Sequence, residues 1–321
     1  MHREQEIIER MRRIATAPEA RGLLDDAALI DGLVVTHDTI AEGVHFFPFD
    51  PPASVGWKLV AVNLSDLAAK GATPAGALLS MSITGDPEWE DLFLQGVEAA
   101  CESYALPLIG GDTIALAEGS PRVFGMTALG RAGERTPARA GGEPGDELWV
   151  AGPVGDSAAG LALLVADPKA AGVLVDIYRR PVPQLAAGRV LAPLAKAMMD
   201  ISDGLLLDAS RLAKASGCRA AIELDEVPLS KAFAIARGQD LKARLFAAAG
   251  GDDYALLAAL PGGIDPATLS LPSGTTMHRI GQLEAGPPGI RLTSEGRPVD
   301  APETLGYEHR GHSASPVADR P

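Results

Sequence analysis

The sequence predicts a protein of mixed α/β (α+β) fold that is built from two domains. Its 321 residues suffice for two domains of ordinary size. Short apolar runs of strand character alternate with stretches in which apolar residues recur at helical spacing. Residues 131–147 are rich in Gly, Pro, Arg and Glu, a composition typical of a junction. We therefore expect domains at residues 1–143 and 144–310.

The first half alternates strands and helices. Residues 4–14 have the pattern of a short amphipathic helix, and an Asp31-Gly32 turn signal lies within the first predicted strand. Further helices are expected at residues 57–70 and 88–104. Strands are expected at residues 27–36, 43–47, 75–83, 106–109 and 122–131. The strand at 106–109 runs into Gly110-Gly111-Asp112.

The second half repeats this alternation. Strands are expected at residues 147–151, 219–224 and 254–259, and helices at residues 157–166, 184–196, 203–216 and within the helical region 229–248. Residues 311–321 contain Ser, Pro, His and Ala without an apolar pattern, so we expect a disordered tail there.

Composition excludes several classes of protein. The chain has 42 acidic and 28 basic residues, a net charge of −14, which argues against a nucleic-acid-binding surface. It has two cysteines, Cys101 and Cys218, without a CxxC motif, so we expect reduced thiols rather than a disulfide framework. The N-terminus lacks the apolar core of a signal peptide, and we find no uninterrupted run of about 18 apolar residues. We expect a cytoplasmic protein without a membrane segment.

Aspartates lie in apolar segments beside Gly, Ser or Thr. These are Asp25-Asp26, Asp38, Asp66, Asp112, Asp200, Asp203 and Asp252-Asp253. A desolvated carboxylate is costly unless it is paired or bound to a metal, and few cationic residues are near these segments. Mg²⁺ takes oxygen ligands and often shares them with phosphates of a substrate. The pattern indicates a Mg²⁺-dependent enzyme that acts on phosphate esters.

Each motif also has a structural interpretation. Asp25-Asp26 and Asp38 are suited to capping backbone amides, whereas Asp66 lies within an apolar helix and has no such local reason. Gly110-Gly111-Asp112 could allow a phosphate to approach the backbone. His45 is either a substrate contact or a packed histidine. We find no Gly-x-Ser-x-Gly elbow, Walker motif, Rossmann fingerprint or zinc pattern.

Five segments resemble the thiamine-monophosphate kinase family in order along the chain. They begin at Thr36-His37-Asp38, Asn63-Leu64-Ser65-Asp66, Gly110-Gly111-Asp112-Thr113, Asp200-Ile201-Ser202-Asp203 and Gly251-Asp252-Asp253-Tyr254. The match runs from about residue 4 to His309. This resemblance implies ATP-dependent phosphorylation of thiamine monophosphate to thiamine diphosphate. It also implies the two-domain fold of aminoimidazole ribonucleotide synthetase, in which N-terminal domains pair strands across a homodimer and the nucleotide lies in a cleft bordered by both domains.

The resemblance also implies roles for individual residues. The Mg²⁺ ligands would be Asp26, Thr36, Asp38, Asp66, Asp112, Asp200 and Asp203, with Asp66, Asp112 and Asp200 at the centre of the chemistry. Tyr104, Gly111, Arg139 and Ser202 would bind ATP. His45, Asp252 and Tyr307 would hold thiamine monophosphate.

The chain departs from the family pattern at four positions, Leu24, His37, Asp252 and Arg310. None of these removes a principal metal ligand. Two alternatives remain open at this point: another ATP-using enzyme of the same fold, and a protein that binds nucleotide or thiamine phosphate without turning it over. Two enzymes of the same fold are disfavoured by their cysteine requirement. Selenophosphate synthetase uses a Cys or selenocysteine near its N-terminus, and this chain has no Cys before Cys101. The hydrogenase-maturation relatives use a C-terminal Cys, and this chain ends in Pro321.

Overall fold

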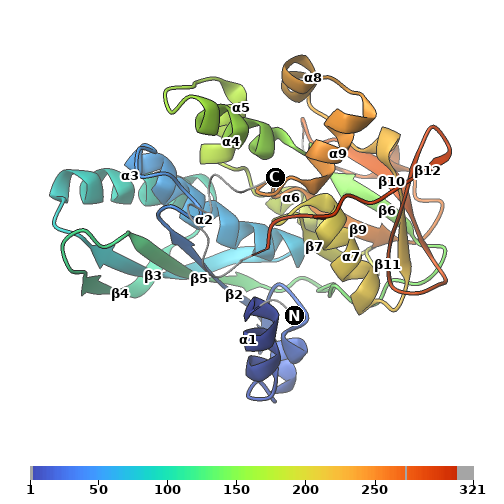
Figure 1. The fold of residues 1–321 in the computed structure, drawn as a ribbon. Coiled ribbons are helices and arrows are strands. Elements are labelled where there is room, and N and C mark those ends of the chain that lie inside the picture. The colour runs from blue at the N-terminus through green and yellow to red at the C-terminus, as the bar shows by residue number, and fades with distance from the viewer. Residues whose placement is uncertain (1–2, 272, 309–321) are drawn as a thin grey trace.

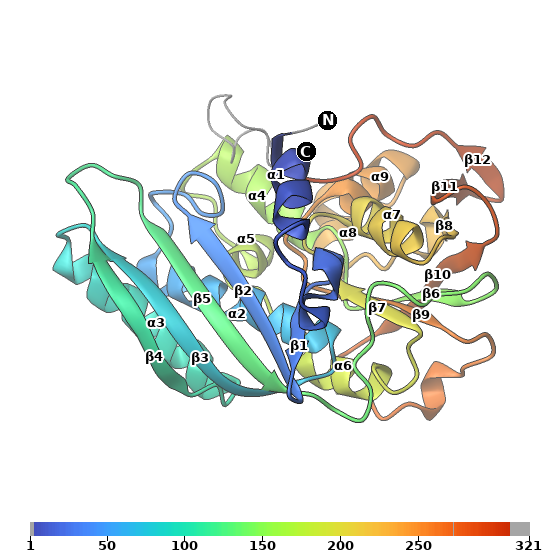
Figure 2. The same cartoon turned by 90° about the horizontal axis from the view of Figure 1, so that it is seen from below.

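Two β-sheets form the framework of the computed structural model, which describes residues 3–271 and 273–308. The first sheet has the order β1-β2-β5-β3-β4. Its strands are β1 (Ala28–Ile30), β2 (Leu33–Ala41), β3 (Thr73–Ile83), β4 (Leu108–Ala115) and β5 (Val123–Arg131). Helices α2 (Pro52–Ala69) and α3 (Pro87–Ser103) cover one face of this sheet. Figure 2 shows the opposite face, over which the described chain places only α1 (Arg3–Arg12) and the short 3-10 helix η1 (Pro18–Leu23), which packs against β1.

The second sheet has seven strands in the order β12-β11-β8-β10-β6-β9-β7. They are β6 (Glu147–Ala151), β7 (Ala197–Asp200), β8 (Arg219–Glu223), β9 (Leu256–Leu260), β10 (Met277–Glu284), β11 (Gly289–Ser294) and β12 (Arg297–Val299). The helices of this half are α4 (Asp156–Ala166), α5 (Val173–Arg179), α6 (Leu185–Leu191), α7 (Leu205–Ala215), α8 (Lys231–Arg237) and α9 (Leu241–Ala249). The two halves lie side by side (Figure 1).

Helix α2 joins the two halves. Its C-terminal part packs against α6 and β7 of the second half as well as against its own sheet. The contact is close because Gly188 of α6 has no side chain: a Cβ there would lie 2.0 Å from the carbonyl oxygen of Ala68. Leu67, Leu191 and Met198 belong to one apolar core that crosses this boundary. Residues of α2 are therefore fixed relative to the end of β7.

Several elements differ from the sequence-based predictions. The predicted strand at residues 43–47 is a turn, because Gly43 has a φ of 77° and the amides of Val44 and His45 bond to the carbonyl of Ala41. The strand expected at 106–109 instead spans Leu108–Ala115 and includes the glycines, which pair with β3. The helix expected at 184–196 ends at Leu191.

Some elements were not expected at all. Helix α5 and strands β10, β11 and β12 were missed, and the short strand β7 was recognised only as a junction before Asp200. The predicted disordered tail at 311–321, together with His309 and Arg310, lies outside the described residues. None of the described helices is long and apolar enough to cross a membrane.

Candidate metal- and phosphate-binding site

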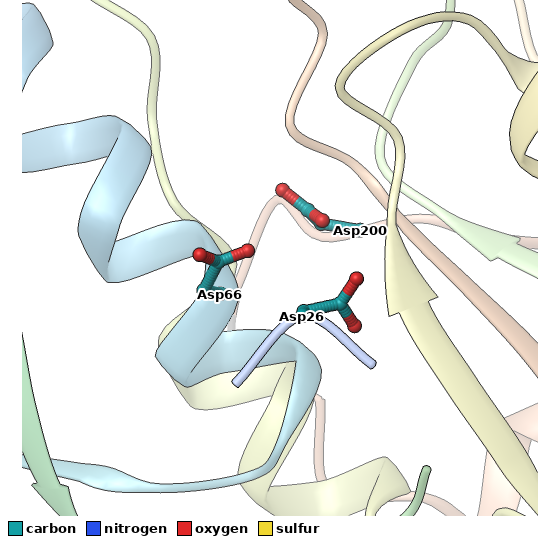
Figure 3. Close-up of side chains that lie close together, drawn as sticks. All are labelled: Asp26, Asp66 and Asp200. Atoms are coloured by element: carbon teal, nitrogen blue, oxygen red, sulfur yellow. The ribbon is translucent and has the colours of Figure 1, made fainter. Parts of the chain in front are cut away.

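Three carboxylates from distant parts of the sequence meet between the two halves. Asp26 lies in the loop before β1, Asp66 on α2 and Asp200 at the end of β7. One oxygen of each lies within 4.8 Å of the others, and Figure 3 shows the three side chains converging. A shared cation is the usual reason for carboxylates to approach so closely, and an all-oxygen donor set fits Mg²⁺.

Neutral donors hold two of these carboxylates in position. The Thr36 hydroxyl on β2 donates a hydrogen bond to Asp66, and the Ser65 hydroxyl on α2 donates to Asp200 at 2.7 Å. The second bond joins the two halves of the molecule. Nearby, the Asn63 side chain accepts from the amide of Asp38 at 3.1 Å, which fixes β2 against α2.

The carboxylates lie in an environment that disfavours negative charge. Burial, followed by repulsion from neighbouring aspartates, raises the pKa of Asp38 to about 6 and that of Asp200 to about 8. The same causes raise the pKa of Asp66 well above its usual value. The metal-free site therefore retains protons at neutral pH, and a divalent cation would displace them.

Asp26 differs because two cations contact it. Lys70 Nζ lies 2.6 Å from its Oδ2, and Arg139 Nε donates to its Oδ1 at 2.5 Å. Burial raises the pKa of Asp26, but the charges of Lys70 and Arg139 outweigh burial and lower it. Asp25 also contacts Lys70 and ion-pairs with Arg21. Lys70 was missed as a site residue in the sequence. Its place four residues after Asp66 was a usable signal of a cation near the site, although it pairs with Asp25 and Asp26 and not with Asp66.

A cleft of about 290 Å³ contains these groups and most of the predicted site residues. Its lining includes Asp26, Asp38, His45, Asp66, Arg139, Asp200, Ser202, Asp203, Asp252 and Tyr307. Thr36 is buried beside the cleft and bonds to Asp66. Both halves of the chain contribute to the lining, so their relative placement determines the shape of the cleft.

A second polar cluster surrounds Asp252, which also lines the cleft. Asp252 adopts a φ of 68°, and its amide bonds to Ser202 O at 2.7 Å. Its carboxylate contacts Lys58 Nζ and the Tyr254 hydroxyl, each at 3.1 Å. Lys58 also donates to His45 O at 3.1 Å. Lys58 thus links His45 to Asp252, and sequence reasoning had assigned no role to this buried lysine.

The loop after Asp200 is held by a carboxylate that sequence reasoning also missed. Asp208 on α7 accepts hydrogen bonds from the amides of Ser202, Asp203 and Gly204 at 3.0–3.2 Å. Arg211 pairs with both Asp203 and Asp208. Asp203 therefore faces the cleft from a loop with a fixed backbone.

Three of the predicted site residues do not line the cleft. Gly111 and Asp112 are exposed on β4, the edge strand of the first sheet, and do not line the cleft. Tyr104 caps α3 and packs edge-on against Trp57, with ring centroids 5.6 Å apart. The chain does not bring these residues to its own carboxylate cluster.

Comparison with known proteins identifies the family. Residues 24–132 match the family model described as AIR synthase related protein, N-terminal domain, and residues 143–287 match the corresponding C-terminal domain. The chain is 37% identical to a thiamine-monophosphate kinase of Escherichia coli, with 92% of each protein covered. A second such kinase, from Salmonella typhimurium, is 36% identical over 90% of this chain and 91% of the relative. The chain belongs to the thiamine-monophosphate kinase family.

Solved structures agree with this membership. A structure described as AaThiL complexed with AMPPCP and TMP superposes with a TM-score of 0.81 at 30% identity, covering 94% of this chain and 96% of that one. The thiamine-monophosphate kinase of Stenotrophomonas maltophilia gives a TM-score of 0.73 at 33% identity, covering 92% and 96%. The hydrogenase maturation protein HypE, at 18% identity and a TM-score of 0.68, shares the fold alone. This member of the thiamine-monophosphate kinase family thus has the two-domain architecture that the resemblance implied.

Proposed function

We propose that this chain is a thiamine-monophosphate kinase, which transfers the γ-phosphate of ATP to thiamine monophosphate and forms thiamine diphosphate. The observation that carries the proposal is the cleft between the two halves, where carboxylates from both converge. The relative with the TM-score of 0.81 is described in complex with AMPPCP, an ATP analogue, and with TMP. Its fold covers 94% of this chain, so an equivalent cleft would hold both substrates here.

Mg²⁺ fits the residues of this cleft. Asp66 and Asp200 offer carboxylate oxygens that otherwise retain protons, and Asp26, Asp38, Asp203 and Thr36 lie beside them. When bound, Mg²⁺ would supply positive charge that offsets the repulsion between the phosphates of the two substrates. The net charge of −14 makes this compensation necessary, since the protein otherwise repels polyanions.

The protein's own groups would bind and orient the substrates. Arg139 lines the cleft and can donate to phosphate oxygens, and Ser202 lines the same cleft. We assign His45, Asp252 and Tyr307 to thiamine monophosphate, as the family resemblance implies, and all three line the same cleft as Arg139. The Asp252 carboxylate is fixed by Lys58 and Tyr254.

The reaction requires no general base. The acceptor is a phosphate oxygen that is already ionised near neutral pH, so positioning and charge compensation supply most of the catalysis. We therefore propose direct in-line transfer without a phosphoenzyme. Incubation with ATP that is radiolabelled at its γ-phosphate, without thiamine monophosphate and followed by rapid quenching, should leave the protein unlabelled. Stoichiometric label on the protein would contradict direct transfer.

A second copy of the chain would place the remaining predicted residues. Strand β4 has an unpaired edge, and Leu108, Ile109 and Ile114 expose about half of their surface or more. An exposed apolar edge strand favours pairing with another strand. We propose that β4 takes part in a homodimer interface, and that Tyr104, Gly111 and Asp112 act on the ATP side of a site shared between the two copies.

The function is tested by product formation. Purified protein with ATP, Mg²⁺ and thiamine monophosphate should form thiamine diphosphate and ADP in equal amounts, and EDTA should abolish both. ADP without thiamine diphosphate would retain the ATP site but assign a different acceptor. Binding of both substrates without any product would favour the non-catalytic alternative.

A further inference from the structure

Lys70 presents a buried ammonium group to the carboxylate cluster. It caps the C-terminal end of α2, and its side chain has 0% exposure. Its Nζ lies 2.5 Å from Asp25 Oδ1, 2.6 Å from Asp26 Oδ2 and 3.2 Å from Met198 O. Lys70 donates hydrogen bonds to Asp25 Oδ1 and Met198 O and contacts Asp26 Oδ2 as an ion pair. Lys70 therefore connects the loop before β1, helix α2 and the strand that ends at Asp200.

The contact between Lys70 and Asp26 divides the carboxylate cluster into two parts. Asp26 has a cation at each oxygen, Lys70 at Oδ2 and Arg139 at Oδ1. Asp66 and Asp200 instead accept hydrogen bonds from the uncharged hydroxyls of Thr36 and Ser65. Among the described residues no Lys or Arg forms an ion pair with Asp66 or Asp200, so a divalent cation there meets no cation already bound to those carboxylates. At Asp26 it would be repelled by an ammonium and a guanidinium that are already in place.

We propose that Lys70 acts as a resident cation which occupies Asp26 and weakens the binding of divalent cations there. Divalent cations then bind mainly through Asp66 and Asp200, and Asp26 contributes little to their affinity. Arg139 can leave Asp26 for a phosphate because it is partly exposed, with 24% of its side chain accessible. Lys70 has no accessible surface and stays. The inference rests on the proposed function only in that the cluster binds Mg²⁺.

The first test replaces Lys70 by Met, which has a similar length and no charge. Mn²⁺ serves as the probe for the Mg²⁺ site, and free Mn²⁺ is followed by electron paramagnetic resonance without nucleotide or thiamine phosphate. We expect Lys70→Met to bind Mn²⁺ about tenfold more tightly than wild type, or to bind one additional ion, because the repelling charge is gone. The melting temperature of the metal-free variant should fall by roughly 10 °C, since two buried carboxylates lose a partner. Saturating Mg²⁺ should restore most of that loss.

Lys58→Met is the matched control. Lys58 lies on the same helix, its side chain is 3% exposed, and it pairs with Asp252 instead of Asp26. Its loss should lower the melting temperature but change Mn²⁺ affinity by no more than about twofold, because it lies roughly three helical turns from Lys70. An equal rise in Mn²⁺ affinity in both variants would overturn the inference, since any loss of buried charge would then suffice.

A second test keeps Lys70 in place. If Lys70 already occupies Asp26, Asp26→Asn should weaken Mn²⁺ binding by no more than about threefold, whereas Asp66→Asn should weaken it by about a hundredfold or more. Equal losses in the two variants would overturn the inference, as would unchanged or weaker Mn²⁺ binding by Lys70→Met. The comparison of Asp26→Asn with Asp66→Asn tests the role of Lys70 even if Lys70→Met does not fold. Because no kinase substrate is present, an inactive protein with these affinities would refute the proposed function and leave the role of Lys70 intact.

Discussion

Asp66 is the residue whose position is hardest to explain without a ligand. It lies on a largely buried helix rich in apolar residues, within 4.8 Å of oxygens from Asp26 and Asp200. Burial and three neighbouring carboxylates raise its pKa, so its ionised form is unfavourable in the metal-free protein. A residue that destabilises the free fold in this way is expected to serve binding or catalysis.

Replacing Asp66 by Asn should therefore separate function from stability. The amide retains an acceptor for the Thr36 hydroxyl but removes the charge that binds Mg²⁺. We expect turnover to fall by about a hundredfold or more, while the melting temperature of the metal-free protein stays unchanged or rises. Steady-state kinetics and thermal unfolding measure the two effects. Asp176→Asn on α5, an exposed carboxylate outside the cleft, is the control. Near-normal turnover of Asp66→Asn would refute its assigned role.

The raised pKa values also predict how stability depends on pH. Asp38 and Asp200 have a usual value of 3.8 and values of about 6 and about 8 in the fold. Between the usual pKa and the raised pKa of each group, the folded protein binds more protons than the unfolded chain. The free energy of unfolding of the metal-free protein therefore falls as pH rises from about 4 to about 8. Mg²⁺ needs the ionised carboxylates, so its affinity should increase over the upper part of the same range.

The predicted pH dependence is tested by thermal unfolding at a series of pH values, once with EDTA and once with saturating Mg²⁺. The stabilisation by Mg²⁺ should be larger at pH 8 than at pH 6. In Asp200→Asn the pH dependence of the metal-free protein should be flatter. A metal-free wild type that becomes more stable between pH 6 and pH 8 would contradict the raised pKa values.

At the scale of elements, the contact between α2 and α6 sets the width of the cleft. Gly188 allows the two helices to touch at Ala68, two residues from Asp66 in the sequence. The Ser65–Asp200 hydrogen bond then links α2 to β7 across the same boundary. A small change in helix separation would therefore move Asp66 relative to Asp200.

Gly188→Ala should disturb both stability and activity. The added methyl group would lie 2.0 Å from the Ala68 carbonyl oxygen, so the helices must separate. Overpacking of this kind costs about 1–3 kcal/mol, and we expect kcat to fall more than affinity for either substrate. Kinetics and denaturant unfolding provide the measurement. Gly133→Ala is the control, because a Cβ there would lie 3.8 Å from the nearest of its contacts. Unchanged kcat in Gly188→Ala would show that the cleft does not depend on this contact.

At the scale of the whole molecule, one chain leaves part of the predicted site outside its own cleft. Asp112 is exposed on β4, whereas the other predicted metal ligands line the cleft or border it. The apolar side chains beside Asp112 are exposed on the same strand, and the face of the sheet seen in Figure 2 is largely free of helices. A dimer through this sheet would cover these side chains.

We therefore expect wild-type protein to be dimeric in light scattering after size-exclusion chromatography. Ile109→Asp combined with Ile114→Asp places charges on the exposed edge strand and should give a monomer. If Asp112 acts in the partner's site, this monomer should also lose most kinase activity while keeping its melting temperature within a few degrees. A monomeric wild type with full activity would refute the dimer proposal.

The sequence by itself determined the alternation of helices and strands and the residue types available to the site. These follow from apolar periodicity, turn residues and the cost of burying aspartate, which are local properties of the chain. Strands β10 and β11 escaped prediction because they pair with β6 and β8, which lie far away in the sequence. Strand β12 pairs with its neighbour β11 across a turn at Glu295-Gly296, a local signal that was overlooked. Only the tertiary structure decided that Lys70 and Arg139 occupy Asp26, that Lys58 fixes Asp252, and that Asp112 stays apart from the cleft. Charges interact through space, so their partners are known only when the fold has brought distant segments together.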